Sequence, residues 1–435
     1  MKNHSINRRF KFDVIPALAI CSALFFAGCS ALDELLSVEA PSQVVATDLQ
    51  VPGAASLLVA SVANEFRCAA GYYAAASALT GMEWADASEN SVLNIWDQRV
   101  HDPSGYGARF ASADCGSNEP AIYQPLSRTR WLGDQTLEQL EGWTAAEVPD
   151  KAKFTAEVSL YVGYTYLYFG EAMCENSVAY DGGPVQTLAQ SFQLAVDRFD
   201  AAIATASGDV LNAARVGKAR ALLNMGQTAA AAAVAAAVPA GFSYKLQYSG
   251  VDQDLYNKLW EFNDDDDNVT IGSTYRGVMT EGVPDPRIPV TDKGVVNSNS
   301  GIEVWVTSKF STADTPLELA SWEEAQLIIA ENEIDLGNAG AAVAIFDALH
   351  DAVGLPDYSG GTTAAELKNQ LIFERSAENF LEGQHLQDIK RLNIPLFPAV
   401  GVPIAFGGAY GGQVCFVLPA SEFQNNLCIS EGICS

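Results

Sequence analysis

Residues 219–238, "ARALLNMGQTAAAAAVAAAV", carry the same pattern as residues 330–349, "AENEIDLGNAGAAVAIFDAL". When the two stretches are aligned, Gly226 falls on Gly337, and apolar residues coincide after it. Each copy is predicted to form a helix, a glycine turn and a second helix, because glycine ends helices and small residues let two helices approach closely. The repetition therefore predicts a mainly α-helical (all-α) fold.

Helical periodicity also precedes the first copy. Residues 151–175 and 187–206 place apolar side chains every three or four positions, as a helix packed on at least one face does. We therefore expect a scaffold of tetratricopeptide-like helical hairpins over residues 125–238 and 316–391. A generic alanine-rich helical bundle is the alternative.

Two stretches interrupt this periodicity. Residues 81–125 are rich in Gly, Asp, Asn and Ser, while residues 240–315 contain Pro284, Pro286 and Pro289, which forbid a helix there. Alternating runs such as "IEVWV" suggest a few short strands. We expect both stretches to be irregular insertions that bind the ligand, because binding usually resides in loops held by a rigid scaffold.

The N-terminal residues have the features of an export signal. Basic residues precede an apolar run over residues 14–27, which is shorter than the roughly 20 residues that a membrane-spanning helix needs. The stretch "FAGC", ending at Cys29, resembles the lipobox of bacterial lipoproteins, in which the cysteine carries the lipid. An ordinary secreted protein is the alternative. The expected divisions are a signal peptide (1–28), a lipid-anchored tether and first helix (29–50) and one domain (51–435).

The formal net charge of −28 limits the partners of this chain. Nucleic-acid phosphates would repel it, so we expect no nucleic-acid binding. Anionic lipid headgroups would repel it too, so we expect membrane attachment through the N-terminal lipid alone. Hydrophobic residues make up 49% of the chain, which is enough for a large core.

Six cysteines follow Cys29, and an even number in an exported chain suggests disulfides whose pairing the sequence leaves open. Metal binding is the rival interpretation. It is disfavoured because there is no CxxC pair and the histidines are far apart in sequence, so we expect neither a metal nor a cofactor. The last two cysteines could close a small terminal loop. The cysteines are Cys68, Cys115, Cys174, Cys415, Cys428 and Cys434.

Aromatic residues in the two insertions are the candidate ligand contacts. Sugar rings stack on aromatic faces, and planar polar groups hold their hydroxyls. Each aromatic residue taken alone could instead belong to the core, where we place Trp131 and Trp322 because they lie within helical patterns. Asn94, Asp97 and Asn297 are nearby polar groups. The candidates are Trp84, Trp96, Tyr106, Trp260, Tyr275, Arg276 and Trp305.

The acidic stretch "NDDDDN", residues 263–268, has two interpretations. Several carboxylates in a flexible loop suit Ca²⁺, a hard cation. The spacing is not that of a calcium-binding loop, so a solvated acidic loop is favoured, and calcium binding by residues 264–267 stays open.

Residues 374–391, "ERSAENFLEGQHLQDIKR", resemble the C-terminal half of SusD/RagB-like nutrient-binding lipoproteins. That family typically shows a pattern close to "ER…EL…EG.R..DLKR". Here His385 stands where an arginine is common, and Asn379-Phe380 replaces the usual Glu-Leu. Residues 285–290, "DPRIPV", and 416–426, "FVLPASEFQNN", resemble further elements of the family.

The resemblance implies a SusD-like fold of helical hairpins with irregular segments that form the ligand face. It also implies an outer-membrane lipoprotein exposed at the cell surface, partnered by a TonB-dependent, SusC-like barrel transporter. The ligands of the family are mostly oligosaccharides, with peptides in some members, and the sequence does not decide between them.

An enzyme and a protein-binding scaffold are the two other function classes. The like-charged helix positions Glu374, Glu378 and Glu382 are interpreted as structural, neutralised by Arg375, Lys390 and Arg391 from the same or packed helices. Carboxylates on adjacent turns of one helix do not surround a sugar, so we expect no enzyme. The alternative function is a lipid-anchored helical-repeat scaffold that binds protein partners in the cell envelope.

Overall fold

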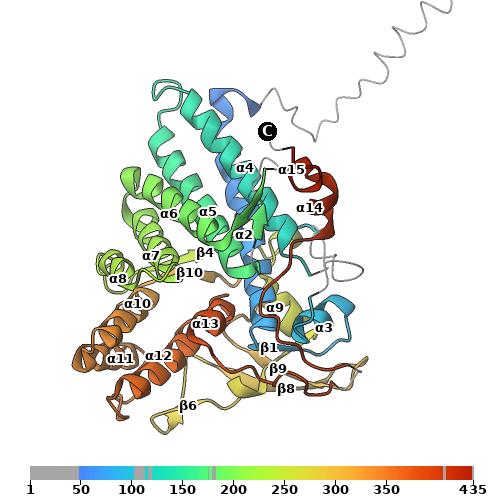
Figure 1. Ribbon diagram of the computed structural model, residues 1–435, viewed down its shortest axis with the longest axis vertical. Helices are drawn as coiled ribbons and strands as arrows, with labels where there is room; N and C mark the ends of the chain where they lie inside the picture. Colours follow the sequence, from blue (N-terminus) through green and yellow to red (C-terminus); the bar gives the residue numbers. More distant parts are fainter. Residues whose placement is uncertain are drawn as a thin grey trace, which may run out of the picture. The chain divides into compact units, whose positions relative to one another are not determined.

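Packed helices make up most of residues Pro52–Ser435, which form one compact unit (Figure 1). The computed structural model describes residues 49–101, 113–115, 120–174, 176–178, 183–404 and 408–433. The predicted signal peptide, the lipidation at Cys29 and nearly all of the tether lie outside the described residues, as do Tyr106 and Cys434.

The mainly α-helical fold is confirmed, and among the described residues no helix combines the length and apolar character needed to cross a membrane. Short 3₁₀ segments and one π-helical segment join the helices: η2 (Pro52–Ala54), η4 (Gln253–Leu255), η5 (Glu261–Asp265, π-helical) and η6 (Ser273–Tyr275). The α-helices are α2 (Ala55–Thr80), α3 (Ser91–Asp97), α4 (Tyr123–Gly142), α5 (Lys151–Ala172), α6 (Leu188–Thr205), α7 (Gly208–Asn224), α8 (Thr228–Ala235), α9 (Lys258–Trp260), α10 (Trp322–Asp335), α11 (Ala339–Val353), α12 (Ala364–Glu378), α13 (His385–Leu392), α14 (Ala420–Asn425) and α15 (Leu427–Ser430).

The repeated hairpin is confirmed in both copies, as α7–α8 and α10–α11. Gly226 and Gly337 have φ values of +73° and +77°, a conformation that favours glycine. After each glycine a backbone N–H reaches back over the helix end: Gln227 donates to the Leu222 carbonyl (2.9 Å) and Asn338 donates to that of Glu333 (2.8 Å). Both first helices therefore end in the same glycine-dependent cap.

The second predicted insertion leaves and re-enters the helical scaffold at one place. β4 follows α8 and β10 precedes α10, and the two strands pair antiparallel with Leu246 opposite Leu317. The other strands also pair two by two, each pair antiparallel. The strands are β1 (Trp84–Asp86), β2 (Asn176–Val178), β3 (Val185–Thr187), β4 (Ser243–Leu246), β5 (Val269–Ile271), β6 (Met279–Thr280), β7 (Val283–Pro284), β8 (Val290–Val296), β9 (Glu303–Thr307) and β10 (Leu317–Ser321).

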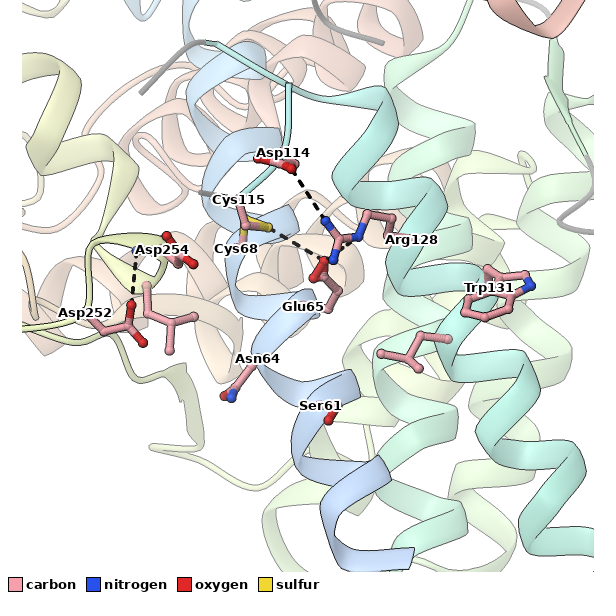
Figure 2. Close-up of a pocket in the computed structure, with 12 residues that line it drawn as sticks. Ser61, Asn64, Glu65, Cys68, Asp114, Cys115, Arg128, Trp131, Asp252 and Asp254 are labelled. Atoms are coloured by element: carbon pink, nitrogen blue, oxygen red, sulfur yellow. Dashed lines mark hydrogen bonds and ion pairs between the residues drawn. A yellow bond between two sulfur atoms is a disulfide. The ribbon is translucent and has the colours of Figure 1, made fainter. Parts of the chain in front are cut away.

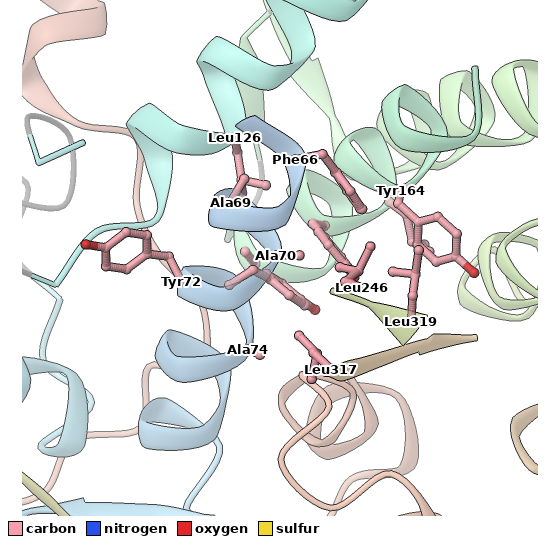
Figure 3. Packing of buried hydrophobic residues seen from close by; sticks show 14 of the residues in the cluster. Phe66, Ala69, Ala70, Tyr72, Ala74, Leu126, Tyr164, Leu246, Leu317 and Leu319 are labelled. Carbon is pink, nitrogen blue, oxygen red and sulfur yellow. The ribbon is translucent and has the colours of Figure 1, made fainter. Parts of the chain in front are cut away.

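The core is centred on α2 and α5, which are buried on most sides. Figure 3 shows Phe66 of α2 and Tyr164 of α5 beside Leu246 and Leu317, so the base of the insertion belongs to the same core. The Phe66 ring stacks on that of Tyr161 with centroids 4.9 Å apart. A helix apolar on all sides is expected where other elements surround it.

Phe199 of α6 lies where three helices approach closely. An added Cβ at Gly163 of α5 would lie 2.7 Å from the Phe199 ring, and one at Gly217 of α7 would lie 2.4 Å from it. Both positions therefore require glycine to accommodate one aromatic ring.

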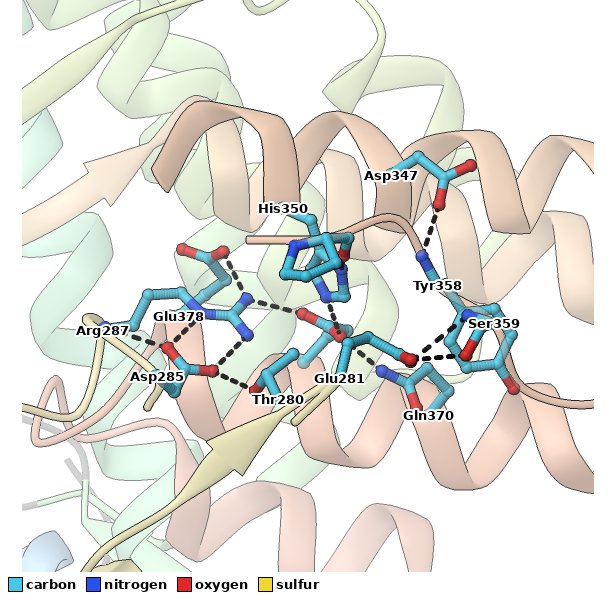
Figure 4. Close-up of polar contacts among 12 residues, drawn as sticks. Thr280, Glu281, Asp285, Arg287, Asp347, His350, Tyr358, Ser359, Gln370 and Glu378 are labelled. Carbon is cyan, nitrogen blue, oxygen red and sulfur yellow. Dashed lines mark hydrogen bonds and ion pairs between the residues drawn. The ribbon is translucent and has the colours of Figure 1, made fainter. Parts of the chain in front are cut away.

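Arg287 is the centre of a buried polar network (Figure 4). Its guanidinium donates to Asp285 (Nη2–Oδ2, 2.7 Å), Glu374 (Nη1–Oε2, 2.6 Å) and Glu378 (Nη1–Oε1, 2.8 Å). Glu374 also contacts His350, whose Nε2 lies 2.8 Å from its Oε1. The network joins the "DPR" stretch to α11 and α12.

The structural role expected for the glutamates of residues 374–391 fits these contacts. The prediction of which basic residues neutralise them was wrong. Arg287 neutralises Glu374 and Glu378, and Lys309 pairs with Glu382 (2.7 Å). The three expected cations have other partners. Arg375 and Arg391 both pair with Asp388, and Arg391 also pairs with Glu331. Lys390 donates to the Glu171 carbonyl.

Two disulfides join distant parts of the chain, Cys68–Cys115 and Cys174–Cys415. The first ties α2 to the end of the first insertion. The second ties the end of α5 to the C-terminal segment, 241 positions away. Cys428 is disulfide-bonded as well.

Candidate ligand-binding site

The two predicted insertions meet through a strand pair. β1 of the first insertion pairs antiparallel with β5 of the second, with Trp84 opposite Ile271 and Asp86 opposite Val269. The contact continues at Gly272, whose N–H donates to the Glu83 carbonyl (2.8 Å). A Cβ at Gly272 would lie 2.5 Å from the Met82 carbonyl oxygen, so this close approach requires glycine.

A C-terminal segment closes a third side, and we call residues 397–404 and 408–416 the strap. The N–H of Gly411 donates to the Gln98 carbonyl (2.7 Å), and the Arg99 Nε donates to the Gly411 carbonyl (3.2 Å). The guanidinium of Arg99 also lies 5.0 Å from the centre of the Tyr410 ring. The Cys174–Cys415 disulfide holds the end of the strap against α5.

These three segments enclose a cavity of about 270 Å³, which we call the polar cavity. Its walls combine carboxylates, an amide, hydroxyls, one guanidinium and aromatic rings, the mixture that fixes an uncharged polar ligand in a pocket. Its lining residues are Met82, Trp84, Ala85, Asp86, Asn94, Asp97, Thr270, Gly272, Ser273, Thr274, Arg276, Ile302, Phe397, Pro398, Ile404 and Tyr410.

Two buried carboxylates form the acidic side of the polar cavity. Asp86 accepts hydrogen bonds from Ser88 and from the Asn94 amide (3.3 Å). Asp97 accepts one from the Tyr410 hydroxyl (3.3 Å). Burial is the main cause, and the nearby charge of Asp86 the second, that raises the pKa of Asp97 to about 7. The charge on this side therefore changes near neutral pH.

Arg276 supplies the cation of the polar cavity. Its Nε donates to the Ile271 carbonyl (2.9 Å), Nη2 donates to the Thr270 hydroxyl (3.3 Å), and the guanidinium lies 5.0 Å from the centre of the Trp305 ring. Partial burial lowers its pKa from the ordinary value. These contacts fix the plane of a side chain that would otherwise be flexible.

The structure gathers part of the predicted site. Trp84 and Arg276 line the polar cavity together with Asn94 and Asp97. Trp305 does not line it, but its ring packs against the Arg276 guanidinium. Trp84 is only 2% exposed, and its buried indole N–H has no hydrogen-bond partner among the described residues.

The other predicted aromatic residues lie outside the polar cavity. Trp96 is buried in the core, where its ring packs edge-on against Phe416. Tyr275 is buried against Phe380, and Trp260 is half-buried beside Tyr256. As ligand contacts, these residues stay predictions.

The contribution of the strap to the polar cavity was not predicted from the sequence. Phe397 is 54% exposed and Tyr410 half-buried, and both line the polar cavity. The only local signal was composition: Phe397 precedes Pro398, and Tyr410 stands between glycine pairs in "FGGAYGGQ". Such Gly- and Pro-rich stretches predict loops without indicating what they contact.

A second, larger cavity of about 640 Å³ lies along α2 and α4 (Figure 2), and we call it the open cavity. Figure 2 shows Arg128 pointing toward Glu65 (2.9 Å) and Asp114 beside the Cys68–Cys115 disulfide. The assignment of Trp131 to the core was wrong: it is 54% exposed on the surface of α4 and lines this cavity. Trp322 does pack against the core.

The acidic loop carries its own cation. Lys293 of β8 lies 2.7 Å from Asp267 Oδ1 and 3.4 Å from Asp264 Oδ1. Within the described ranges no group of three or more His, Cys, Asp or Glu side chains is arranged to hold a metal ion. Lys293 thus neutralises part of the charge of the loop, and the interpretation of residues 264–267 as a solvated acidic loop stays a prediction.

No protein-family model matches this sequence, and no curated protein matches it. Solved structures do. A SusD superfamily protein from Bacteroides vulgatus is 17% identical, with a TM-score of 0.64 over 86% of this chain and 97% of that one. A SusD superfamily protein from Parabacteroides distasonis is 12% identical, with a TM-score of 0.65 over 88% and 98%. A laminarin-binding SusD-like protein is 14% identical, with a TM-score of 0.62 over 85% and 96%. The chain therefore has the SusD superfamily fold that the resemblance of residues 374–391 predicted.

Proposed function

We propose that this protein binds an oligosaccharide in the polar cavity and performs no chemistry on it. The observation that carries the proposal is the joint construction of this cavity from both insertions and the strap. Hydrogen-bonding groups of both charge signs line it beside the Trp84 and Tyr410 rings. Hydroxyl-rich, uncharged ligands match such a surface, whereas a polyanion would meet Asp86 and Asp97.

Similar structures support the ligand class. One solved neighbour is described as a SusD-like carbohydrate-binding protein and another as laminarin-binding. Their low identity to this chain leaves the particular sugar open, so the experiment has to survey glycans broadly.

The test is a binding panel of plant, algal and bacterial glycans against the purified protein, followed by calorimetry on the best binder. Arg276→Ala and Asp97→Asn are expected to weaken binding about tenfold or more, which corresponds to about 1.4 kcal/mol. Arg128→Ala, in the open cavity, is the matched control and should bind normally. Equal losses in all three variants, or no glycan bound, would reject the proposal, and release of reducing ends from the bound glycan would contradict the absence of catalysis.

The sequence supports a second proposal, which concerns the cellular role. We propose that the chain is anchored to the outer membrane through lipid at Cys29, faces the cell surface and delivers its ligand to a TonB-dependent, SusC-like transporter. The lipobox-like stretch "FAGC" supports the anchor.

Affinity capture from detergent-solubilised envelopes should recover a large plugged β-barrel, and Cys29→Ser should release the protein from membranes. Recovery of envelope-assembly proteins alone would instead favour the scaffold alternative.

A further inference from the structure

A third cavity adjoins the polar cavity, and we call it the apolar cavity. It measures about 320 Å³ and shares Met82, Thr274 and Phe397 with the polar cavity. Side chains of α12, including Ile372, form part of its wall. The two cavities are therefore neighbours, and these three shared residues lie at their junction.

The chemistry of the apolar cavity differs from that of its neighbour. Neither a carboxylate nor a Lys or Arg side chain is among its described lining residues, whereas Asp86, Asp97 and Arg276 line the polar cavity. The Tyr275 ring forms part of it and stacks on Phe380, with centroids 5.0 Å apart. Apolar side chains predominate in this lining, and its polar members are Thr274, Asn369, Ser376 and His385. A single bound molecule would thus meet carboxylates and a guanidinium at one end and a mainly apolar surface at the other.

The residues at the junction are held in place. The Phe397 N–H lies 2.9 Å from the Met82 sulfur, which joins the strap to the end of α2. Met82 has a φ of +70°, an uncommon conformation for a residue other than glycine. The Phe397 side chain is nevertheless 54% exposed. An exposed phenyl ring on a backbone that is anchored to Met82 is suited to contact an apolar group that crosses from one cavity to the other.

We propose that the ligand is a glycan carrying an apolar substituent, such as an aryl or acyl group. The saccharide occupies the polar cavity and the substituent occupies the apolar cavity, passing beside Phe397. This inference rests on the proposed oligosaccharide function and adds the substrate class. Binding would remove apolar surface of the substituent, and of Phe397 and Ile372, from water, which favours association.

The test compares methyl and phenyl glycosides of one oligosaccharide, the best binder of the glycan panel, by calorimetry. The phenyl glycoside is expected to bind about tenfold more tightly. Ile372→Asn, which places an amide in the apolar cavity, should abolish this advantage and leave the methyl glycoside unaffected. Phe397→Ala, at an exposed position that does not threaten folding, should lower the ratio of phenyl-glycoside to methyl-glycoside affinity, although this residue also lines the polar cavity and its loss can weaken binding of both glycosides.

The outcomes separate the two proposals. If the oligosaccharide binds but both glycosides bind equally, the apolar-substituent inference is wrong and the proposed function stands. If the phenyl advantage persists in both variants, the apolar cavity is not its cause and the inference is again wrong. If no glycan binds, or only hydrophobic peptides bind, the proposed function fails and the inference fails with it.

Discussion

Arg287 and Glu374 lie 87 positions apart in the chain and meet through a 2.6 Å hydrogen bond between fully paired, buried side chains. The contact fastens the end of the second insertion to α12. Because Asp285 and Glu378 share the same guanidinium, removing the arginine would leave these two carboxylates without their cation.

We therefore expect Arg287→Ala to lower the free energy of unfolding by about 3–5 kcal/mol, since breaking a buried ion pair strands its partner charges. Denaturant unfolding followed by circular dichroism measures this. The control is Asp200→Asn, which removes the partner of Lys218 at the surface and should cost less than about 1 kcal/mol. Equal losses in the two variants would show that the network contributes no more than a surface pair.

The same network predicts a pH dependence through His350. Both ring nitrogens face oxygens: Nδ1 lies 2.7 Å from the Pro356 carbonyl and Nε2 lies 2.8 Å from Glu374. The hydrogen bond to Glu374 raises the pKa of His350 above its ordinary value. The protonated histidine therefore stabilises the fold fully below the unfolded pKa of about 6.5, and this stabilisation is lost as the pH rises through the folded pKa.

The measurement is the free energy of unfolding of the wild type and His350→Gln between pH 5 and pH 9. The difference between the two should be largest at low pH and should shrink above about pH 6.5. Comparing the two proteins isolates His350 from other groups that titrate in this range, such as Glu378, whose pKa burial raises to about 7. A difference that grows with pH would contradict the assignment.

Packing around Phe199 gives a third prediction. Gly217→Ala places a methyl group where the Phe199 ring lies 2.4 Å away, so we expect a loss of about 1–3 kcal/mol from overpacking. The control is Gly340→Ala in α11, where an added Cβ has nothing within 4 Å. It should leave stability unchanged or raise it by up to about 1 kcal/mol, because alanine favours helix. Thermal unfolding of both variants decides the matter.

How much the sequence could predict depends on how local the signal was. Gly226 and Gly337 act on the helices that directly precede them, so their turns were predictable from the repeat. The partner of Glu374 was not, because Arg375 and Lys390 are near it in sequence, whereas Arg287 reaches it only after the second insertion has packed against α12.

The candidate site shows the same division. Arg276, Asn94 and Asp97, which line the polar cavity, were predicted as ligand contacts or nearby polar groups because they lie in stretches with the composition of insertions; as ligand contacts they stay predictions. Trp96 was expected at the surface for the same reason, but it is buried because the insertion packs on the core. Phe397 reaches the site through the fold alone, since it contacts Met82 from 315 positions away.

The Cys174–Cys415 disulfide leads to a fourth prediction, which concerns binding as well as stability. Replacing both cysteines with alanine should lower the free energy of unfolding by about 2–5 kcal/mol and should weaken glycan binding, because the strap that carries Phe397 and Tyr410 loses its covalent anchor. The matched control, alanine at both Cys68 and Cys115, should lose stability but keep its glycan affinity. Equal affinity losses in the two double variants would contradict a specific role for the strap.

The proposed glycan binding is expected to depend on pH through Asp97. With its pKa raised to about 7, the carboxylate is largely protonated at pH 6 and ionised at pH 8. Sugar hydroxyls donate stronger hydrogen bonds to the ionised form, so glycan affinity should increase between these values. Asp97→Asn should bind more weakly and with little dependence on pH, as measured by calorimetry at both values. Asp114→Asn, in the open cavity, should retain the wild-type profile.

The pairing of β4 with β10 also bears on how such a protein can change over time. The two ends of the second insertion meet beside α8 and α10, because β4 pairs with β10. The insertion is therefore a loop whose ends are already closed by the strand pair. Residues can be replaced, added or removed beyond that closure at small entropic cost. Evolution, or an engineer, could therefore vary the loops of the second insertion while the helical array persists. This is consistent with neighbours that share the architecture at only 12–17% sequence identity.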